Sequence, residues 1–101
     1  MVPRVRVILY ATLRAAVGAR IVDLGPEVGA GSTVWDAVHA LIARHPVLGR
    51  QLLDGDGQLW PHVHVMVNGR DAPYLENGLD TALGLHDTLD VFPPVGGGWE
   101  H

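Results

Sequence analysis

The segment of residues 33–45 restricts the fold of this chain more than any other, because it is the one clear helix in the sequence. Ser32 or Thr33 is the N-cap, and Asp36 lies three residues after Thr33, where a weaker form of the capping box places its acidic partner. The apolar positions recur at helical spacing, namely Val34, Ala37, Val38, Leu41 and Ile42. A helix with one apolar face must cover a second layer, and the segments around it identify that layer as a sheet.

Two segments with the alternation of half-buried strands precede the helix. In residues 4–10, one face of the predicted strand carries Val5, Val7 and Leu9. Residues 20–24 form a plausible second strand, antiparallel to the first, and residues 11–19 between them fit a short loop or a single helical turn. Pro46 ends the main helix or starts a second short one.

Three more strands are predicted after the helix. Residues 61–67 alternate, with the inward face formed by Val63, Val65 and Val67. Asn68-Gly69 then favours a type I′ hairpin turn into a short strand at residues 70–72. The last strand begins near Leu89. A helix that follows an N-terminal hairpin must cover one face of a mixed sheet, so we predict an α+β fold with about four to five strands and one main helix across one face.

Composition excludes several classes of function. The 101 residues are 48% hydrophobic, enough for the core of one domain, and the net charge of −4 with no basic patch argues against nucleic-acid binding. The absence of cysteine excludes disulfides, thiolate metal sites and a cysteine nucleophile. We expect no membrane segment and no signal peptide, since neither an apolar run of membrane length nor an apolar leader is present, and therefore a cytoplasmic location.

The C-terminal stretch combines a strand, a stiff spacer and a thread. Leu89 and Val91 face one way in the strand, and Asp90 and Phe92 face the other. Pro93 and Pro94 end regular pairing because proline cannot donate to a sheet ladder. Val95 and then Gly96, Gly97 and Gly98 follow, and three glycines can pass through a channel too narrow for other residues.

The run from Phe92 to Gly98 resembles the tail of the ubiquitin-like sulfur carriers. The likeness is greatest to the small subunit of molybdopterin synthase, whose chains typically close with Phe-Pro-Pro-Val-x-Gly-Gly. The segment from Tyr10 to Arg14 resembles the aromatic-Ala-x-Leu-Arg stretch that follows the first strand in this family. The resemblance covers nearly the whole chain. It implies a β-grasp (ubiquitin-like) domain over residues 1–95, with first and last strands adjacent, and a flexible tail over residues 96–101.

The resemblance also implies a function in which the protein is a cosubstrate. Gly98, preceded by Gly97, would be the reactive terminus: a ubiquitin-activating-type enzyme adenylates it with ATP and it becomes a thiocarboxylate. The acceptor would be a partner such as the large subunit of molybdopterin synthase. Catalysis then lies in the partners, and the chain itself binds no cofactor and no metal. Trp99-Glu100-His101 follow Gly98 and would first be removed by a protease.

The partner is expected to bind the sheet face opposite the helix, next to the tail. Alternation places on this face Arg6, Ile8, Tyr10, His62, His64, Met66, Asp90 and Phe92. The partner-binding set is predicted to be Ile8, Tyr10, Met66, Phe92, Pro93, Pro94, Val95 and Gly96. Phe92 is the principal candidate because its strand leads into the tail.

Other functions fit the same sequence. The carrier could serve another acceptor pathway (thiamine, cysteine or tRNA thiolation), or it could be a protein modifier attached through Gly98. A binding module that keeps the fold, with Trp99-Glu100-His101 as a permanent cap, is the main alternative. His62 and His64 have a spacing that zinc sites use, but no third ligand is marked, and two solvent-facing histidines are the simpler interpretation. The loop at residues 54–58 lacks the later ligands of a calcium loop.

Overall fold

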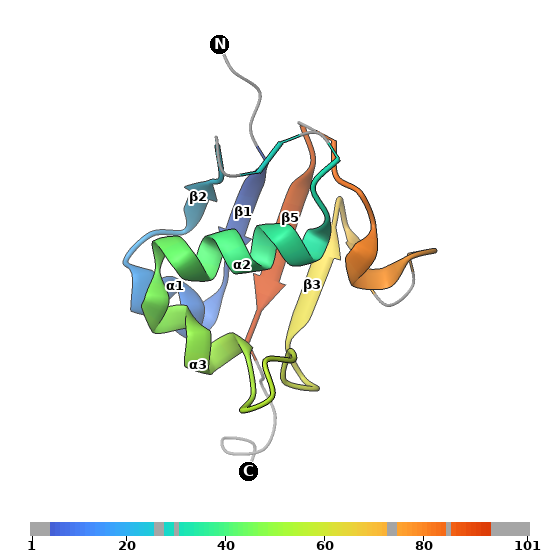
Figure 1. Ribbon diagram of the computed structural model, residues 1–101. Coiled ribbons are helices and arrows are strands. Elements are labelled where there is room, and N and C mark those ends of the chain that lie inside the picture. Colours follow the sequence, from blue (N-terminus) through green and yellow to red (C-terminus); the bar gives the residue numbers. More distant parts are fainter. Residues whose placement is uncertain (1–4, 26–27, 30, 73–74, 85, 94–101) are drawn as a thin grey trace.

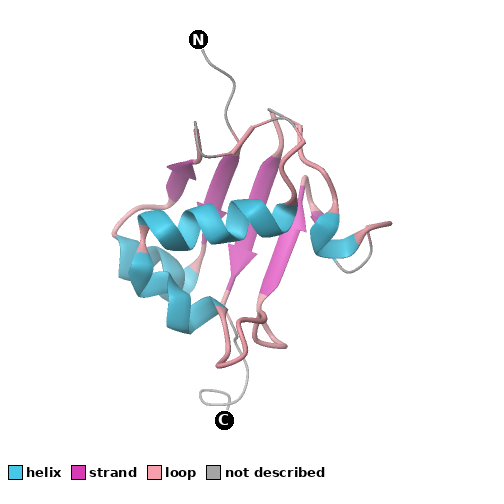
Figure 2. Cartoon of the chain, viewed as in Figure 1, coloured by secondary structure: helices cyan, strands magenta, loops and turns pink. Residues whose placement is uncertain are grey.

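The computed structural model describes residues 5–25, 28–29, 31–72, 75–84 and 86–93. Within these ranges a five-stranded sheet has the order β2-β1-β5-β3-β4, and helix α2 crosses one of its faces (Figure 1). The strands are β1 (Arg6–Leu9), β2 (Ile21–Asp23), β3 (His64–Val67), β4 (Arg70–Asp71) and β5 (Thr88–Phe92). Figure 2 shows this two-layer α+β arrangement of one helical layer on one sheet. The predicted mixed sheet with one main helix is confirmed.

The first and last strands lie side by side at the centre of the sheet, as predicted. β1 and β5 pair in parallel, with Val7 opposite Leu89 and Leu9 opposite Val91. The other neighbours are antiparallel: β1 pairs with β2, and β3 pairs with both β5 and β4. β5 is therefore hydrogen-bonded on both edges, which fixes the position of its last residue.

The main helix, α2 (Val34–Arg44), begins after Thr33, one of the two predicted N-caps. The Asp36 amide donates to the Thr33 hydroxyl (3.0 Å) and the Thr33 amide donates to the Asp36 carboxylate (2.9 Å), which completes the capping box. The Val34 amide also donates to the Thr81 carbonyl at 3.0 Å. The start of the helix is thus joined to the segment that leads into β5.

The core between α2 and the sheet is aliphatic. Of the described residues, no polar or charged one is buried. The strands contribute the alternate residues that the sequence pattern placed inward, and α2 contributes its apolar face. The core residues include Val5, Val7, Leu9, Val22, Val34, Val38, Leu41, Val65, Val67, Leu89 and Val91. Each fully buried aliphatic side chain adds roughly 1.5–3 kcal/mol to the transfer free energy that drives folding.

Short helices fill the connections. α1 (Ala11–Val17) is longer than the single turn predicted; it ends at Gly18, whose φ of 81° suits a glycine C-cap, and it buries Leu13. A 3-10 turn, η1 (Pro46–Leu48), leads into α3 (Gly49–Leu52), so Pro46 does start a second short helical segment. Another 3-10 turn, η3 (Gly78–Asp80), precedes β5.

The predicted hairpin turn between β3 and β4 is present. Asn68 has φ 51° and Gly69 has φ 85°, the two positive values that a type I′ turn requires. The Asn68 side chain also accepts from the Thr88 amide at 3.0 Å. The turn is thereby fixed to the start of β5.

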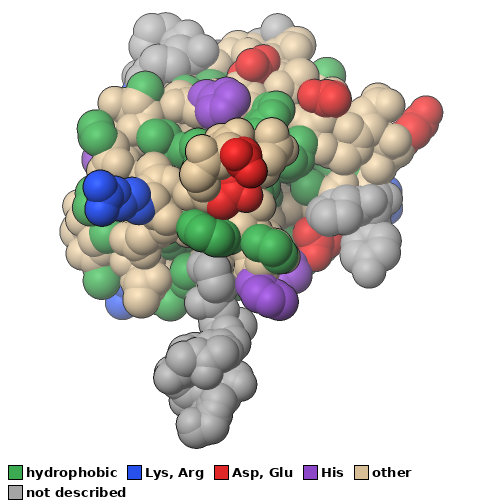
Figure 3. Space-filling view, turned by 60° about the horizontal axis from the view of Figure 1, so that its bottom comes forward, with side chains coloured by type: hydrophobic (Ala, Val, Ile, Leu, Met, Phe, Trp, Pro, Cys, Tyr) green, Lys and Arg blue, Asp and Glu red, His purple; other side chains and the backbone are tan. Residues whose placement is uncertain are grey.

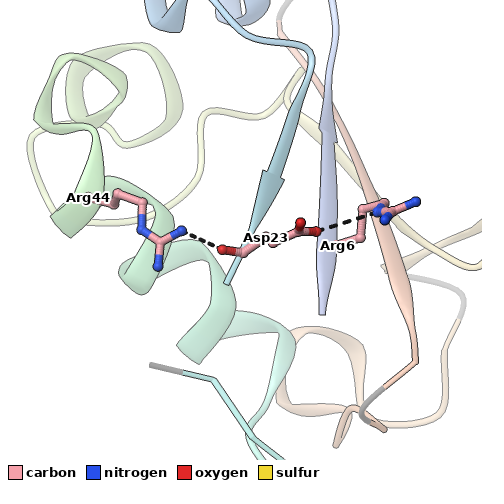
Figure 4. Close-up of polar contacts among 3 residues, drawn as sticks. All are labelled: Arg6, Asp23 and Arg44. Atoms are coloured by element: carbon pink, nitrogen blue, oxygen red, sulfur yellow. Dashed lines mark hydrogen bonds and ion pairs between the residues drawn. The ribbon is translucent and has the colours of Figure 1, made fainter. Parts of the chain in front are cut away.

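Polar contacts connect the end of α2 to the edge of the sheet (Figure 4). The Arg44 guanidinium donates to the backbone carbonyl of Asp23 on β2. On the other side of the same residue, the Asp23 carboxylate accepts from Arg6 Nε on β1 at 3.4 Å. Both side chains of that pair are well exposed, so the ion pair adds little stability and mainly orients its two partners.

None of the helices in the described ranges is long and apolar enough to span a membrane.

Candidate functional site

The candidate site is the sheet face that α2 leaves uncovered. Its side chains alternate with those of the core, and most are half-buried or exposed. They are Arg6, Ile8, Tyr10, Ile21, Asp23, His64, Met66, Asp71, Thr88, Asp90 and Phe92. The strands hold these residues on one surface because successive side chains on a strand point to opposite faces. The structure thus brings together the predicted residues Ile8, Tyr10, Met66 and Phe92.

The strand register orders this face into rows. Ile21 on β2 is opposite Ile8 on β1, and Ile8 is opposite Asp90 on β5. Asp90 is in turn opposite Met66 on β3. The row therefore places one carboxylate between two apolar side chains in the middle of the sheet. Ile21, with 46% of its surface exposed, extends the row to the edge.

Tyr10 and Phe92 form the aromatic part of the face. Their rings stack, with centroids 4.2 Å apart and an interplanar angle of 12°. The Tyr10 phenol donates a hydrogen bond to the Asp90 carboxylate at 2.8 Å. Together these contacts hold the end of β5, where Phe92 is the last strand residue, against the end of β1.

The hydrogen bond to Asp90 raises the pKa of the Tyr10 phenol above its ordinary value. Partial burial and the negative charge of Asp90 act in the same direction, because both disfavour the phenolate. Arg20 opposes them, since a nearby cation favours the phenolate. Tyr10 therefore stays a neutral hydrogen-bond donor over the physiological pH range.

The chain turns sharply just after Tyr10. Ala11 has φ 52°, in the left-handed region that non-glycine residues seldom adopt. This conformation ends the extended backbone of Tyr10 and starts α1. Strained residues persist where the surrounding structure determines them, and here the strain sets the position of an aromatic residue of the candidate site.

The other border of the face carries a histidine and a carboxylate. His64 Nδ1 lies 3.1 Å from Asp71 Oδ2, while Asp71 Oδ1 is buried without a hydrogen-bond partner. His64 is also opposite Phe92 in the register. Across the part of the chain that the structure describes, no three His, Cys, Asp or Glu residues are grouped so that they could hold a metal ion.

Two arginines lie at this site: Arg6 belongs to the face, and Arg20 acts on the phenol of Tyr10. Figure 3 shows the lower end of the molecule, where acidic and hydrophobic side chains occupy the middle of the view and blue side chains lie toward its edge. One open depression of about 560 Å³ is lined by α1 and the turn after it, where Arg14 and Arg20 border small residues. Among the described residues, none of the predicted site residues lines this depression, although Ala11 directly follows Tyr10.

The tail itself is outside the described residues. Pro93 is buried and is the last residue before the stretch 94–101. The predicted roles of Pro94, Val95, Gly96, Gly97 and Gly98, and the division at residues 95 and 96, therefore remain predictions.

Comparison with known proteins identifies the family. The sequence profile of the ThiS family matches residues 7–98. The chain belongs to the ThiS family. The predicted membership of the ubiquitin-like sulfur carriers and the β-grasp fold are thus confirmed.

Two relatives of this ThiS-family chain differ in their names. This chain is 40% identical over 90 residues to the small archaeal modifier protein 1 of Haloferax volcanii. The match covers 89% of this chain and 95% of the relative. The crystal structure of that protein has a TM-score of 0.80 and 36% identity, covering 93% of this chain and 98% of the other. This chain is also 40% identical over 75 residues to a putative sulfur carrier protein of Archaeoglobus fulgidus. That match covers 71% of this chain and 82% of the relative.

A third similarity is to a protein solved with a partner. A chain in the crystal structure of the Amycolatopsis orientalis BexX/CysO complex has a TM-score of 0.72 and 27% identity. The match covers 93% of this chain and 99% of the other. The proteins similar to this chain thus include one named as a modifier, one named as a sulfur carrier and one solved in a complex.

Sequence reasoning missed part of this face. Ile21 was not among the predicted binding residues, although the inward alternation of Val22 and Leu24 would have placed it on the outer face. The contact between Tyr10 and Asp90 joins residues 80 positions apart, and no local pattern identifies it.

Proposed function

We propose that this chain is a sulfur carrier whose Gly98 carboxylate is activated by a partner enzyme. In the first step the carboxylate attacks ATP bound to that enzyme, which gives an acyl-adenylate and pyrophosphate. A sulfur donor then displaces AMP, and Gly98 carries a thiocarboxylate that donates its sulfur to an acceptor. We further propose the acceptor to be most like the large subunit of molybdopterin synthase, which makes this chain the small-subunit equivalent in molybdenum cofactor biosynthesis. The location would be cytoplasmic.

The observation that carries this proposal is the way the fold leads into the glycines. β5 is paired on both edges, and its last residue, Phe92, is stacked on Tyr10. Pro93 follows at once, and the family match continues to Gly98. A rigid strand that ends in a proline spacer and unhindered glycines suits insertion of a chain terminus into an enzyme pocket. Trp99-Glu100-His101 lie beyond the match, in keeping with the proposed removal by a protease.

The uncovered sheet face supports a role in docking. It offers Ile8, Tyr10, Met66 and Phe92 as a half-buried apolar group on rigid strands, next to the point where the tail begins. Aromatic residues and methionine are enriched in protein interfaces, and aromatic side chains bury large apolar areas. Such a face would hold the carrier in one orientation while the tail enters the active site of the partner.

The name of the Haloferax relative favours a second candidate, a protein modifier. The activation of Gly98 would be the same, but an amine of a target protein would displace AMP and form an amide bond. The two functions therefore differ only in the nucleophile that receives the activated glycine. A capped binding module differs from both, because it would keep residues 99–101.

The intact mass of the protein from its own cells distinguishes these functions. A species that ends at Gly98 and is heavier by one oxygen-to-sulfur exchange would support the sulfur carrier. Adducts in which Gly98 is joined to other proteins would support the modifier. A population that keeps Trp99-Glu100-His101 throughout, in cells where the pathway is active, would support the capped module and contradict the carrier.

Deleting Gly97 and Gly98 from the processed chain tests whether the tail acts only in transfer. We expect the thermal unfolding midpoint to stay nearly unchanged, because the described core ends before these residues, and sulfur transfer to be abolished. The matched control is the chain that ends at Gly98. A large loss of thermal stability on deletion would show that the tail is part of the folded structure and would contradict the carrier function.

A further inference from the structure

Asp90 occupies an unusual position on the docking face. It lies on the central strand β5, between Ile8 of β1 and Met66 of β3 in the register. Its side chain is half-buried, and the aromatic pair of Tyr10 and Phe92 is next to it. A charged group is thus surrounded by the apolar side chains that the proposed function places against a partner.

The other carboxylates of this face have cationic or potentially cationic neighbours. Asp23 lies 3.4 Å from Arg6 Nε, and Asp71 lies 3.1 Å from the imidazole of His64. Asp90 accepts its hydrogen bond from the neutral phenol of Tyr10, and within the described ranges it forms no ion pair. Among the described carboxylates of this face it is therefore the one without a directly paired cation, although Arg20 lies close enough to Tyr10 to favour its phenolate. The net charge of the chain is −4.

Covering this face would remove water from Asp90. Tyr10 donates to Oδ1, so Oδ2 would lose its hydration without a replacement. Burying an unpaired carboxylate strongly opposes binding, whereas a hydrogen-bonded cation from the other side offsets this cost. A partner with a purely apolar surface would therefore be rejected, and one with a matching cation would be selected.

We propose that the protein partner covering this face presents an arginine or lysine side chain to Asp90, and that this pairing selects the partner. The inference rests on the proposed function, which supplies the partner. A single guanidinium nitrogen or a lysine ammonium can donate to Oδ2 while Tyr10 keeps Oδ1, and such a charge-assisted hydrogen bond is stronger than one between neutral groups. Specificity then comes from one charge at the centre of the interface, and affinity comes from the apolar side chains around it.

The test uses the activating enzyme from the same genome and the processed carrier. Asp90→Asn keeps the shape of the side chain and an acceptor for Tyr10 but removes the charge. We expect its dissociation constant for that enzyme to rise at least about tenfold, because one member of a desolvated charge pair is lost. Raising the salt concentration should weaken wild-type binding more than binding of the variant. The matched control is Glu76→Gln, which removes the same charge from an exposed loop position.

Asp90→Arg provides a second variant, for which we expect a larger loss because two cations would face each other. Thermal unfolding of each variant, measured alone, shows that the fold is intact. Unchanged or tighter binding by Asp90→Asn would overturn the inference, since an apolar partner binds better once the charge is removed. If the wild-type carrier is neither bound nor adenylated by the enzyme, the proposed function fails and the inference fails with it.

Discussion

The two faces of the sheet are built from the same strands and differ in almost every other respect. On β5, Leu89 and Val91 point toward α2 and are fully buried, whereas Asp90 and Phe92 point away and are half-buried. The inner face is aliphatic, and none of the described polar residues is buried there. The outer face combines aromatic rings, a methionine and carboxylates that have defined partners.

Because successive side chains on a strand point to opposite faces, residues that serve stability alternate with residues available for recognition. Side chains of the inner face gain free energy by excluding water, and any that fill the space well can serve. Those of the outer face are arranged by particular contacts, such as the bond between Tyr10 and Asp90. We therefore expect substitutions on the inner face to affect unfolding, and those on the outer face to affect binding.

Replacing Leu89 by Ala should have the largest effect on unfolding. The side chain is 0% exposed, and truncating such a leucine costs about 2–5 kcal/mol through lost burial and a residual cavity. Chemical denaturation would measure this loss. Ile21→Ala is the matched control on the outer face and should cost well under half as much. Similar losses in the free energy of unfolding for both variants would show that the two faces contribute equally to stability and would contradict this comparison.

Replacing Phe92 by Ala should affect partner binding more than stability. The stack with Tyr10 is lost, so we expect a stability loss of about 1 kcal/mol. Affinity for the activating enzyme should fall by about tenfold or more, as for an aromatic residue at the centre of an interface. Calorimetric titration with that enzyme measures this effect. If affinity does not change, Phe92 is not part of the interface.

Replacing Tyr10 by Phe should have the smallest effect: the variant loses the hydrogen bond to Asp90 at neutral pH, and the difference from the wild type should shrink in alkaline solution. The pKa of Tyr10 is raised in the folded state, so above pH about 10 the unfolded chain loses its proton more readily and stability falls as pH rises. The variant lacks this titration. Its unfolding midpoint should therefore decline less steeply between pH about 9 and 12, and parallel curves for the two proteins would contradict the assignment.

Local patterns in the sequence predicted most of the fold. The alternation in β1 identified its inward residues, Asn68-Gly69 identified the hairpin, and Thr33 identified the start of α2, because each signal depends on neighbouring residues. The length of α1 was underestimated. Tyr10 offers no side-chain cap and Ala11 begins the helix at positive φ, so the start of that helix has no sequence signal.

The sequence predicted which residues share the outer face of the sheet, but not which of them touch one another. Alternation placed Tyr10, Asp90 and Phe92 on the outer surface, and the structure agrees. The stacking and the hydrogen bond depend on the parallel register of β1 and β5, which lie at opposite ends of the chain. Register across such a separation is determined by the whole core, so residue patterns within one strand cannot reveal it.

The parallel pairing of β1 and β5 also has a mechanical consequence. β5 is bonded along both edges, and Phe92 is its last residue. A pull on that end acts along the ladders, so it loads their hydrogen bonds together in shear instead of opening them one at a time. An unfolding motor that grips the chain beyond Pro93 would have to break both ladders at once, and the domain should resist extraction from this end.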